Sequence, residues 1–279
     1  MLVIGTLPVN IPLGIYEDMA KIPVGLGTGA LCHAAHQTLK VFGREGDLRL
    51  LTAGAHNSDE LYEFVINERP QGKLACVHYI MPKLTPFERM FGVLRENFSF
   101  LTFDAGGMYA CKACKLAKQA DMFTPDAGEM AFLADKDSTH PAYVQHILLE
   151  IDEEEVKKLV ELAYRNGNLP RYTVVKGEVD LFVRDGKVVK EVSRPCIPEL
   201  EPIGGTGDTL IGILAALIYL GFAPEMAFEL ASGALRRIGE ELRVKPDTLV
   251  GEIIARIPAA LSGALGQSGA LPNSPVGAG

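Results

Sequence analysis

The sequence predicts an α/β fold in which a mostly parallel sheet carries helices on both faces and ends in antiparallel strands at its C-terminal edge. Two observations support this: short apolar runs alternate with stretches of helical period, and an Asp-Gly pair marks a late hairpin. No linker rich in Pro, Gly or Ser divides the chain, so we expect one domain over residues 1–261. The uncharged segment 262–279, rich in Gly, Ala, Ser and Pro, predicts a flexible C-terminal tail.

Four predicted strands are short runs rich in Val, Leu, Phe or Tyr, which is typical of strands covered on both faces. They are Leu2–Ile4, Leu48–Thr52, Leu74–Tyr79 and Phe98–Phe103. Ala120–Phe123 and Tyr172–Lys176 are predicted strands as well. Two further runs, Asp180–Val183 and Lys187–Val192, flank Asp185-Gly186, which is a strong hairpin signal. The sheet should therefore end in antiparallel strands.

Helical periodicity predicts helices between and after these strands. They are Gly29–Val41, Ser58–Asn67, Pro86–Asn97, Met108–Lys118, Thr206–Leu220, Pro224–Leu242 and Thr248–Ile257. One more helix should begin at a capping box formed by Asp152 and Glu155 and should end at Gly167.

Composition limits the classes of partner. The formal net charge is −8, and an acidic chain does not attract a phosphate backbone, so we expect no nucleic-acid binding. No apolar run approaches the ~20 residues of a membrane helix, and the N-terminus lacks the basic region of a signal peptide. The odd count of 5 cysteines suits reduced thiols. We expect a cytoplasmic homo-oligomer without membrane contact.

The most specific motif is the glycine-rich run Gly204-Gly-Thr-Gly-Asp-Thr209, which directly precedes the apolar stretch Leu210–Gly221. Glycines let the backbone turn tightly with its N–H groups pointing one way, and the following helix adds the positive end of its dipole. The motif therefore predicts an anion hole for phosphate, without the Gly-Lys-Ser/Thr of a Walker A loop. Asp208 falls in the first helical turn, where capping is its alternative role.

A second glycine cluster, Gly25-Leu-Gly-Thr-Gly-Ala30, matches the G-x-G-x-x-A form of a dinucleotide fingerprint. Only Ile22–Val24 precedes it as a predicted strand, and no acidic residue closes the next strand. A tight turn into a closely packed helix is favoured, and a substrate-lining role stays open.

Charged residues stand at the predicted carboxyl ends of strands, the edge where open α/β sheets bind ligands. Asp104 follows Phe98–Phe103, and its alternative role is an N-cap for the helix from Met108. Lys176 ends another strand, as a solvated edge charge or as a phosphate contact.

The segment Thr124-Pro-Asp-Ala-Gly-Glu129 places further carboxylates at this edge. Thr124 or Asp126 can cap the following helix, with Glu129 completing a capping box. This structural role and a functional one can coexist.

Cys111 and Cys114 form a lone C-x-x-C motif. A structural zinc site usually needs a second pair, and thioredoxin-like use needs a strand-to-helix junction, whereas these residues lie within a predicted helix. We predict structural thiols with neither zinc nor an obligate disulfide. The histidines show no metal spacing, and the absence of G-x-S-x-G disfavours a hydrolase of that class.

The order of these motifs resembles the ribokinase-like superfamily, and within it the ATP- or ADP-dependent NAD(P)H-hydrate dehydratases. That family shows a strand ending Asp-Ala-Asp, then T-P-H-P-G-E, V-x-K-G and G-[ST]-G-D. The resemblance covers roughly Gly25 to Gly239 and implies a three-layer α/β/α sandwich. Here Asp126 stands at the histidine of T-P-H-P-G-E and Gly106 at the third position of Asp-Ala-Asp, departures that concern the substrate more than the nucleotide site.

The resemblance implies that ATP or ADP phosphorylates the hydroxyl of hydrated NADH or NADPH, after which phosphate is expelled. Asp208 would be the general base, and Glu129 would organise Mg²⁺ through water. The implied nucleotide contacts are Gly204, Gly205, Thr206, Gly207, Lys176 and Gly177. The implied substrate contacts are Thr28, Gly29, Asp104, Asp126 and Asp208.

Two alternatives remain open. The first is a small-molecule kinase for a sugar or vitamin precursor, which releases a stable phosphorylated product. The second is an inert nucleotide-binding sensor, against which the presence of Asp208 argues. The dehydratase and the kinase need the same loop and base, so the sequence does not separate them.

Overall fold

The computed structural model describes residues 1–25, 27–55, 57–138 and 153–268. The chain divides into two compact units. The first unit consists of Met1, Ile15–Leu50 and the chain from Val192 onward, and the second of Leu2–Gly14 and Leu51–Glu191. The single domain over 1–261 stays a prediction.

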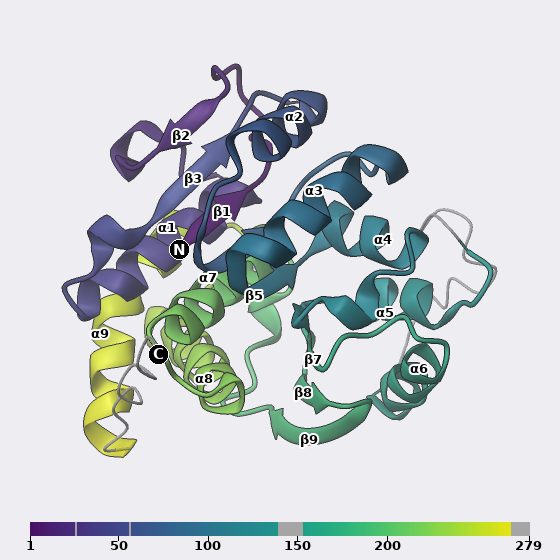
Figure 1. Cartoon of the computed structure of the whole chain (residues 1–279). Helices are drawn as coiled ribbons and strands as arrows, with labels where there is room; N and C mark the ends of the chain where they lie inside the picture. Colours follow the sequence, from purple (N-terminus) through teal and green to yellow (C-terminus); the bar gives the residue numbers. More distant parts are fainter. Residues whose placement is uncertain (26, 56, 139–152, 269–279) are drawn as a thin grey trace. The chain divides into compact units, whose positions relative to one another are not determined.

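Strands in the described part of the chain form a nine-stranded sheet in the order β2-β3-β1-β4-β5-β6-β7-β8-β9 (Figure 1). The strands are β1 Leu2–Ile4, β2 Gly14–Tyr16, β3 Arg49–Thr52, β4 Gly72–Val77, β5 Phe98–Phe103, β6 Met122–Phe123, β7 Tyr172–Val175, β8 Asp180–Arg184 and β9 Lys187–Val192. The pairs from β1 through β4, β5 and β6 to β7 are parallel, and β7 pairs with β8 antiparallel. The predicted α/β class, mostly parallel with an antiparallel edge, is confirmed.

The predicted Asp-Gly hairpin joins β8 to β9. Asp185 and Gly186 both have positive φ, 50° and 74°, as a two-residue hairpin turn requires. A side chain at Gly186 would collide with the ring of Tyr164, since an added Cβ would lie 2.3 Å from Tyr164 Cγ. Glycine is therefore required there for its conformation and for its size.

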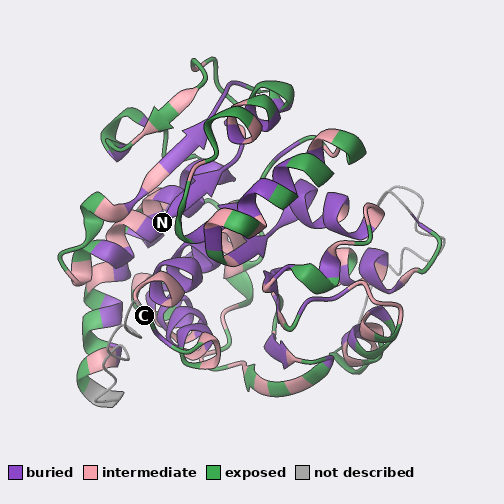
Figure 2. Ribbon diagram, viewed as in Figure 1, coloured by how far each residue is buried: buried purple, intermediate pink, exposed green. Residues whose placement is uncertain are grey.

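The second unit holds the larger hydrophobic core. Its helices are α2 Ser58–Glu68, α3 Leu84–Asn97, α4 Ala105–Ala113, α5 Ala127–Ala134 and α6 Glu153–Arg165. Phe87 and Phe91 of α3 both pack on Phe103 of β5, with ring centroids 5.9 and 5.5 Å away. Burial is nearly continuous along the last residues of β4 and β5 and mixed along β9 (Figure 2).

The helices of the first unit are α1 Thr28–Val41, α7 Thr206–Tyr219, α8 Pro224–Leu242 and α9 Val250–Ser268. α1 packs against α7 and α9, and α8 packs against the same two helices. At Gly212 the backbones of α7 and α1 approach so closely that an added Cβ would lie 2.3 Å from the Leu31 carbonyl oxygen. Among the described residues, no helix has the length and apolar character needed to cross a membrane.

Several sequence-based expectations differ from the structure. Ile22–Val24 forms no strand, because Ile22 ends a 3₁₀ turn and Pro23 lacks an N–H. The helix predicted over Met108–Lys118 is α4, which begins at Ala105 and ends before Lys115, whose φ is 58°. The short strand β2 was not predicted, because Gly14–Tyr16 is too short and too exposed for an alternating pattern.

The fourth correction concerns the C-terminus. α9 continues to Ser268, so residues 262–268 of the predicted tail are helical. The reason is that Ile257, Leu261 and Ala264 continue a buried stripe with helical spacing. The rest of the predicted tail, 269–279, and the predicted cap Asp152 lie outside the described residues.

Candidate functional site

In the second unit, each of four neighbouring parallel strands is followed directly by a polar residue. His78 follows β4, Asp104 follows β5, Thr124 follows β6 and Lys176 follows β7. The register pairs the last residues Val77, Phe103 and Phe123 in one row, so His78, Asp104 and Thr124 come next to one another. The sequence prediction that this edge collects functional groups from separate strands is consistent with this arrangement.

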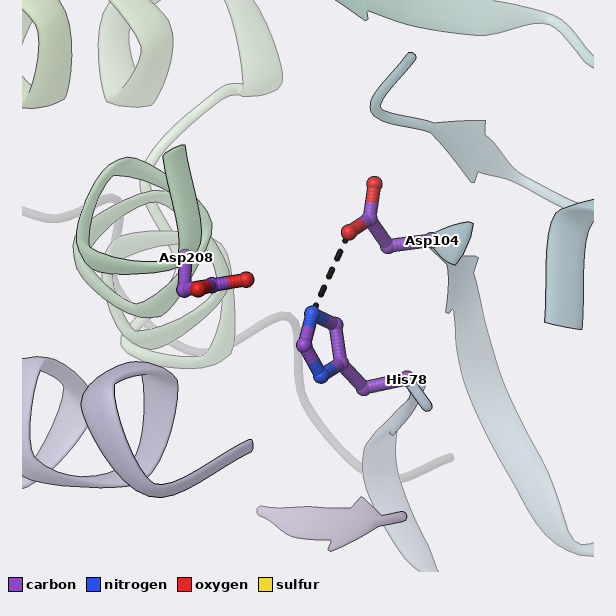
Figure 3. A group of neighbouring side chains, drawn as sticks. All are labelled: His78, Asp104 and Asp208. Atoms are coloured by element: carbon purple, nitrogen blue, oxygen red, sulfur yellow. Dashed lines mark ion pairs between the residues drawn. The ribbon is translucent and has the colours of Figure 1, made fainter. Parts of the chain in front are cut away.

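Asp104 is the centre of this buried polar row. Its Oδ1 accepts hydrogen bonds from Thr124 Oγ1 at 2.8 Å and from Lys176 Nζ at 3.1 Å. Its Oδ2 lies 3.2 Å from Nε2 of His78, the ion pair drawn in Figure 3. The Asp104 side chain is 4% exposed and the His78 side chain 0%. One carboxylate therefore orients three side chains from three strands.

Burial and charge oppose each other at Asp104 and Lys176. Burial alone would raise the pKa of Asp104, but the Lys176 ammonium, the adjacent His78 imidazole and the hydrogen bond from Thr124 hold it well below its usual range. Burial alone would lower the pKa of Lys176, but Asp104 and Glu129 raise it above its ordinary value. Both groups are therefore charged at neutral pH.

Glu129 stands beside this pair. Its Oε1 accepts a hydrogen bond from Tyr109 Oη at 2.7 Å, and its Oε2 lies 4.0 Å from Lys176 Nζ. Burial and repulsion from Asp104 raise the pKa of Glu129 to about 7, although Lys176 partly offsets them. Glu129 therefore changes its protonation state near neutral pH.

Asp126 and Glu129 also form the predicted capping box of α5. Asp126 Oδ1 accepts the Glu129 N–H at 2.8 Å, and Glu129 Oε2 accepts the Asp126 N–H at 2.9 Å. Both Glu129 oxygens thus already have donors close by. A metal ion held through water can leave these contacts in place, whereas a directly bound ion would displace them and face the Lys176 ammonium.

Asp104 does not act as a helix cap. It is the N-cap residue of α4 by position, but its side chain makes no capping hydrogen bond. The N-capping role considered for Asp104 from the sequence is therefore not the role of its side chain. Gly106, two residues later, admits no carboxylate, because an added Cβ would lie 1.9 Å from the Ile80 carbonyl oxygen.

The glycine motif of the first unit has the conformation expected at a helix start. Gly205 is the N-cap of α7 with a φ of 95°, and Asp208 is in the first turn. The hydroxyl of Thr206 donates to the Ile203 carbonyl at 3.0 Å, which fixes the loop. Asp208 Oδ2 accepts the backbone N–H of Gly27 at 2.8 Å, so this hydrogen bond joins Asp208 to the start of α1.

A cavity of about 460 Å³ lies beside this loop, within the first unit. It is lined by Val24, Gly25, Ile203 and Gly204 and by residues 246–251. Leu249 is 70% exposed and Val24 37% exposed, so apolar side chains face the opening. The cavity offers apolar surface beside the glycine loop, a setting that suits a flat ring.

Other predicted site residues are placed as follows. Thr28 and Gly29 open α1 and are buried, with Thr28 0% exposed. Gly177 donates its N–H to Asp180 Oδ1 at 3.1 Å, in the turn after β7. In the second unit the structure thus brings together Asp104, Asp126, Glu129 and Lys176, and in the first it brings Asp208 to the loop before Thr28.

Sequence reasoning missed His78 and Tyr109. His78 was hidden because the apolar run was extended to Tyr79, whereas β4 ends at Val77. Its position directly after a strand was the signal that could have found it. Tyr109 carried no local signal, because its partner Glu129 belongs to another helix.

The two cysteines of the C-x-x-C motif lie at the end of α4, and both are free thiols. Burial raises the pKa of Cys111 well above its ordinary value and that of Cys114 to about 11. Neither thiol is activated, as expected for structural cysteines.

No family model matches the chain. Over 237 residues the chain is 40% identical to the uncharacterized protein MJ1337 of Methanocaldococcus jannaschii, a match that covers 83% of this chain and 98% of that protein.

Several solved structures share the fold. An ADP complex of Bacillus subtilis pyridoxal kinase matches with a TM-score of 0.56 and 14% identity, covering 84% of this chain and 91% of that chain. The tetrameric inhibited form of Escherichia coli phosphofructokinase-2 matches with a TM-score of 0.56 and 14% identity over 94% and 100% of the two chains. Lactobacillus plantarum pyridoxal kinase matches at 0.54 and 13% over 92% and 96%. These neighbours are ribokinase-like, which confirms the predicted fold.

Proposed function

We propose that this chain, which belongs to the same family as the uncharacterized protein MJ1337 of Methanocaldococcus jannaschii, transfers a phosphoryl group from a nucleotide to the hydroxyl of a small molecule. The observation that carries the proposal is the start of α7, where a glycine loop with its N-cap at Gly205 places Asp208 in the first turn. A loop that can hold phosphate and a carboxylate that can take a proton there are the parts that phosphoryl transfer needs.

Gly204, Gly205, Thr206 and Gly207 are the proposed phosphate contacts of the first unit. The positive φ of Gly205, 95°, and the absence of side chains at three of these positions permit close approach of an anion to the backbone N–H groups. The neighbouring cavity would take the base of the nucleotide. The nucleotide complexes of fold neighbours, ADP in Bacillus subtilis pyridoxal kinase and AMP-PCP in Staphylococcus aureus pyridoxal kinase, support ATP or ADP as the ligand.

Asp208 is the proposed general base. In the step proposed, the substrate oxygen attacks the terminal phosphorus, the bond from that phosphorus to the bridging oxygen breaks, and the shortened nucleotide leaves with that oxygen. The hydroxyl proton passes to the Asp208 carboxylate. Glu129, in the second unit, stays the proposed residue that would hold Mg²⁺ through water, and such an ion would offset phosphate charge.

In the second unit, Lys176 is the proposed cation for a phosphate, with Gly177 beside it. Asp104 holds its ammonium at 3.1 Å in a buried setting, so the charge is fixed in place before any ligand arrives. Asp104 and Asp126 stay proposed substrate contacts, as do Thr28 and Gly29 in the first unit. For Asp104 the contacts with Thr124, Lys176 and His78 also support a positioning role.

The dehydratase indicated by the sequence motifs would add an elimination to the same transfer. The kinase is favoured, because the fold neighbours named above are pyridoxal kinases and phosphofructokinase-2. The inert sensor is the outcome in which nucleotide binds and no product forms. Homo-oligomer formation and a cytoplasmic location also stay predictions.

The test is turnover of ATP and ADP with hydroxylated vitamin precursors, sugars and hydrated NADH, in wild type and Asp208→Asn. Asp208→Asn keeps the side-chain shape but cannot take a proton, so turnover should fall about 10²–10⁴-fold while the nucleotide dissociation constant stays nearly unchanged. A stable phosphorylated product identifies a kinase, and recovery of reduced-nicotinamide absorbance identifies a dehydratase. Wild-type turnover in Asp208→Asn would contradict the assignment, since an Asn cap is about as good as Asp.

A further inference from the structure

We propose that Gly27 is a positioning residue for Asp208, whose carboxylate its backbone N–H holds in one orientation during phosphoryl transfer. The inference rests on the function proposed above and deepens it, because it makes the first glycine loop part of the machinery that sets the base. From the sequence, a tight turn into a helix was favoured for this loop, and a substrate-lining role was left open.

The contact joins distant parts of the chain within the first unit. Gly27 N–H donates to Asp208 Oδ2 at 2.8 Å across a sequence separation of 181 residues. Gly27 is the N-cap of α1, and Asp208 is the third residue of α7. Because the acceptor is a carboxylate, this is a charge-assisted hydrogen bond, which is shorter and stronger than a neutral one.

Only glycine suits this donor position. Gly27 has φ 71° and ψ −135°, a conformation that residues with a Cβ rarely adopt. Gly27 is also buried, so its N–H needs a partner inside the protein. Asp208 supplies that partner, and the conformation of the loop and the orientation of the carboxylate are therefore set together.

The bond has a structural counterpart elsewhere in the chain. In the capping box of α5 the third helical residue, Glu129, accepts the N–H of its own N-cap residue, Asp126. Asp208 occupies the same position in α7, but it accepts the N–H of the N-cap residue of a different helix, α1. It thereby ties two helix starts together.

Close packing of α1 against α7 restricts the distance between Gly27 and Asp208. An added Cβ at Gly212 of α7 would lie 2.3 Å from the Leu31 carbonyl oxygen of α1, and one at Gly205 would lie 3.4 Å from Ala30 Cβ. With so little space between them, α1 and α7 have little freedom to slide or separate. A reacting group gains most from such fixed geometry, because displacement by about 1 Å can cost about 10²-fold in rate.

A double-mutant cycle separates positioning from a purely structural role. Gly27→Ala should lower turnover about 10- to 100-fold in wild type, with a nearly unchanged substrate KM. In the Asp208→Ala background, which itself should lose about 10²–10⁴-fold, Gly27→Ala should cause no further loss. Gly43→Ala is the matched control: Gly43 follows the other end of α1, its φ is also positive at 63°, and a Cβ there meets nothing within 4 Å. It should keep wild-type turnover.

A second variant covers the case in which Gly27→Ala does not fold. Ligation at Cys32 joins a synthetic 1–31 segment to recombinant 32–279, which allows glycolic acid to replace Gly27 and removes its N–H without adding a side chain. Turnover should fall in this full-length ester and not in the all-amide chain made in the same way. Additive losses in the cycle, or a fully active ester, would overturn the positioning role alone. Unchanged turnover in Asp208→Ala would overturn the proposed function itself.

Discussion

Lys176 Nζ lies 3.1 Å from Asp104 Oδ1, and the two side chains are only 16% and 4% exposed. They follow β7 and β5, and β6 lies between these two strands. Thr124, the residue after β6, donates a hydrogen bond to the same oxygen of Asp104. A buried ion pair of this kind costs desolvation of both charges, which the pairing then offsets. Each charge therefore depends on the other.

Asp104→Asn should destabilise the protein by up to about 3–5 kcal/mol, because it removes the counter-charge 3.1 Å from the buried Lys176 ammonium and leaves Glu129 Oε2 at 4.0 Å as the remaining ion-pair partner. Urea unfolding with the slope held common to both proteins measures this difference. Glu96→Gln is the matched control, since it breaks the exposed pair with Arg69, whose side chains are 51% and 67% exposed. It should change stability little. Equal effects of the two substitutions would show that the buried pair has no special role.

The pH dependence of stability should report Glu129. Its pKa is raised from 4.5 to about 7 in the folded protein, so its stabilising contribution is fully present below pH 4.5. As the pH rises from there through about 7, the unfolded chain ionises first and this contribution is lost. Glu129→Gln removes the titration, so the stability of wild type relative to this variant should fall over that window. A pH-independent difference would contradict the pKa of about 7.

Gly106→Ala and Gly92→Ala should have opposite effects. At Gly106 an added Cβ would lie 1.9 Å from the Ile80 carbonyl oxygen, which forces the backbone to move and should cost about 1–3 kcal/mol or more. At Gly92, inside α3, an added Cβ meets nothing within 4 Å. There alanine should stabilise the helix by up to about 1 kcal/mol. Thermal unfolding of the two variants against wild type checks both signs.

Gly212→Ala should impair stability and turnover together. The added Cβ would lie 2.3 Å from Leu31 O and 2.8 Å from Ala34 Cβ, so α1 and α7 must move apart. Gly27 and Asp208 stand at the starts of these helices. Turnover should therefore fall even at temperatures at which the variant is folded. Gly233→Ala in α8, where the nearest atom is 3.8 Å away on the Arg237 side chain, should keep full turnover. Wild-type turnover in Gly212→Ala would contradict the prediction that the proposed reaction depends on the packing of α1 against α7.

Local patterns predicted those parts of the site that follow from a single stretch of chain. Asp104 and Lys176 come directly after apolar runs, and the capping box of Asp126 and Glu129 is a spacing of three residues. His78 was missed because hydrophobicity does not mark where pairing with the next strand stops. The hydrogen bond between Gly27 and Asp208 could not be predicted from the sequence for another reason. The two residues are 181 positions apart, and neither motif contains a signal that indicates contact with the other.

The make-up of the first unit has a consequence for how the protein is synthesised. Ile15–Leu50 is made before nearly all of the second unit, and the chain from Val192 onward is made after it. Because domains fold as units while the ribosome adds about 5–20 residues per second, α1 emerges well before α7 and α9, the helices that cover it. A nascent chain that stalls after Glu191 already contains every residue of the buried row around Asp104 but no Asp208. The proposed activity therefore requires that α7 has been synthesised. Chains that stall before α7 cannot consume nucleotide by the proposed route.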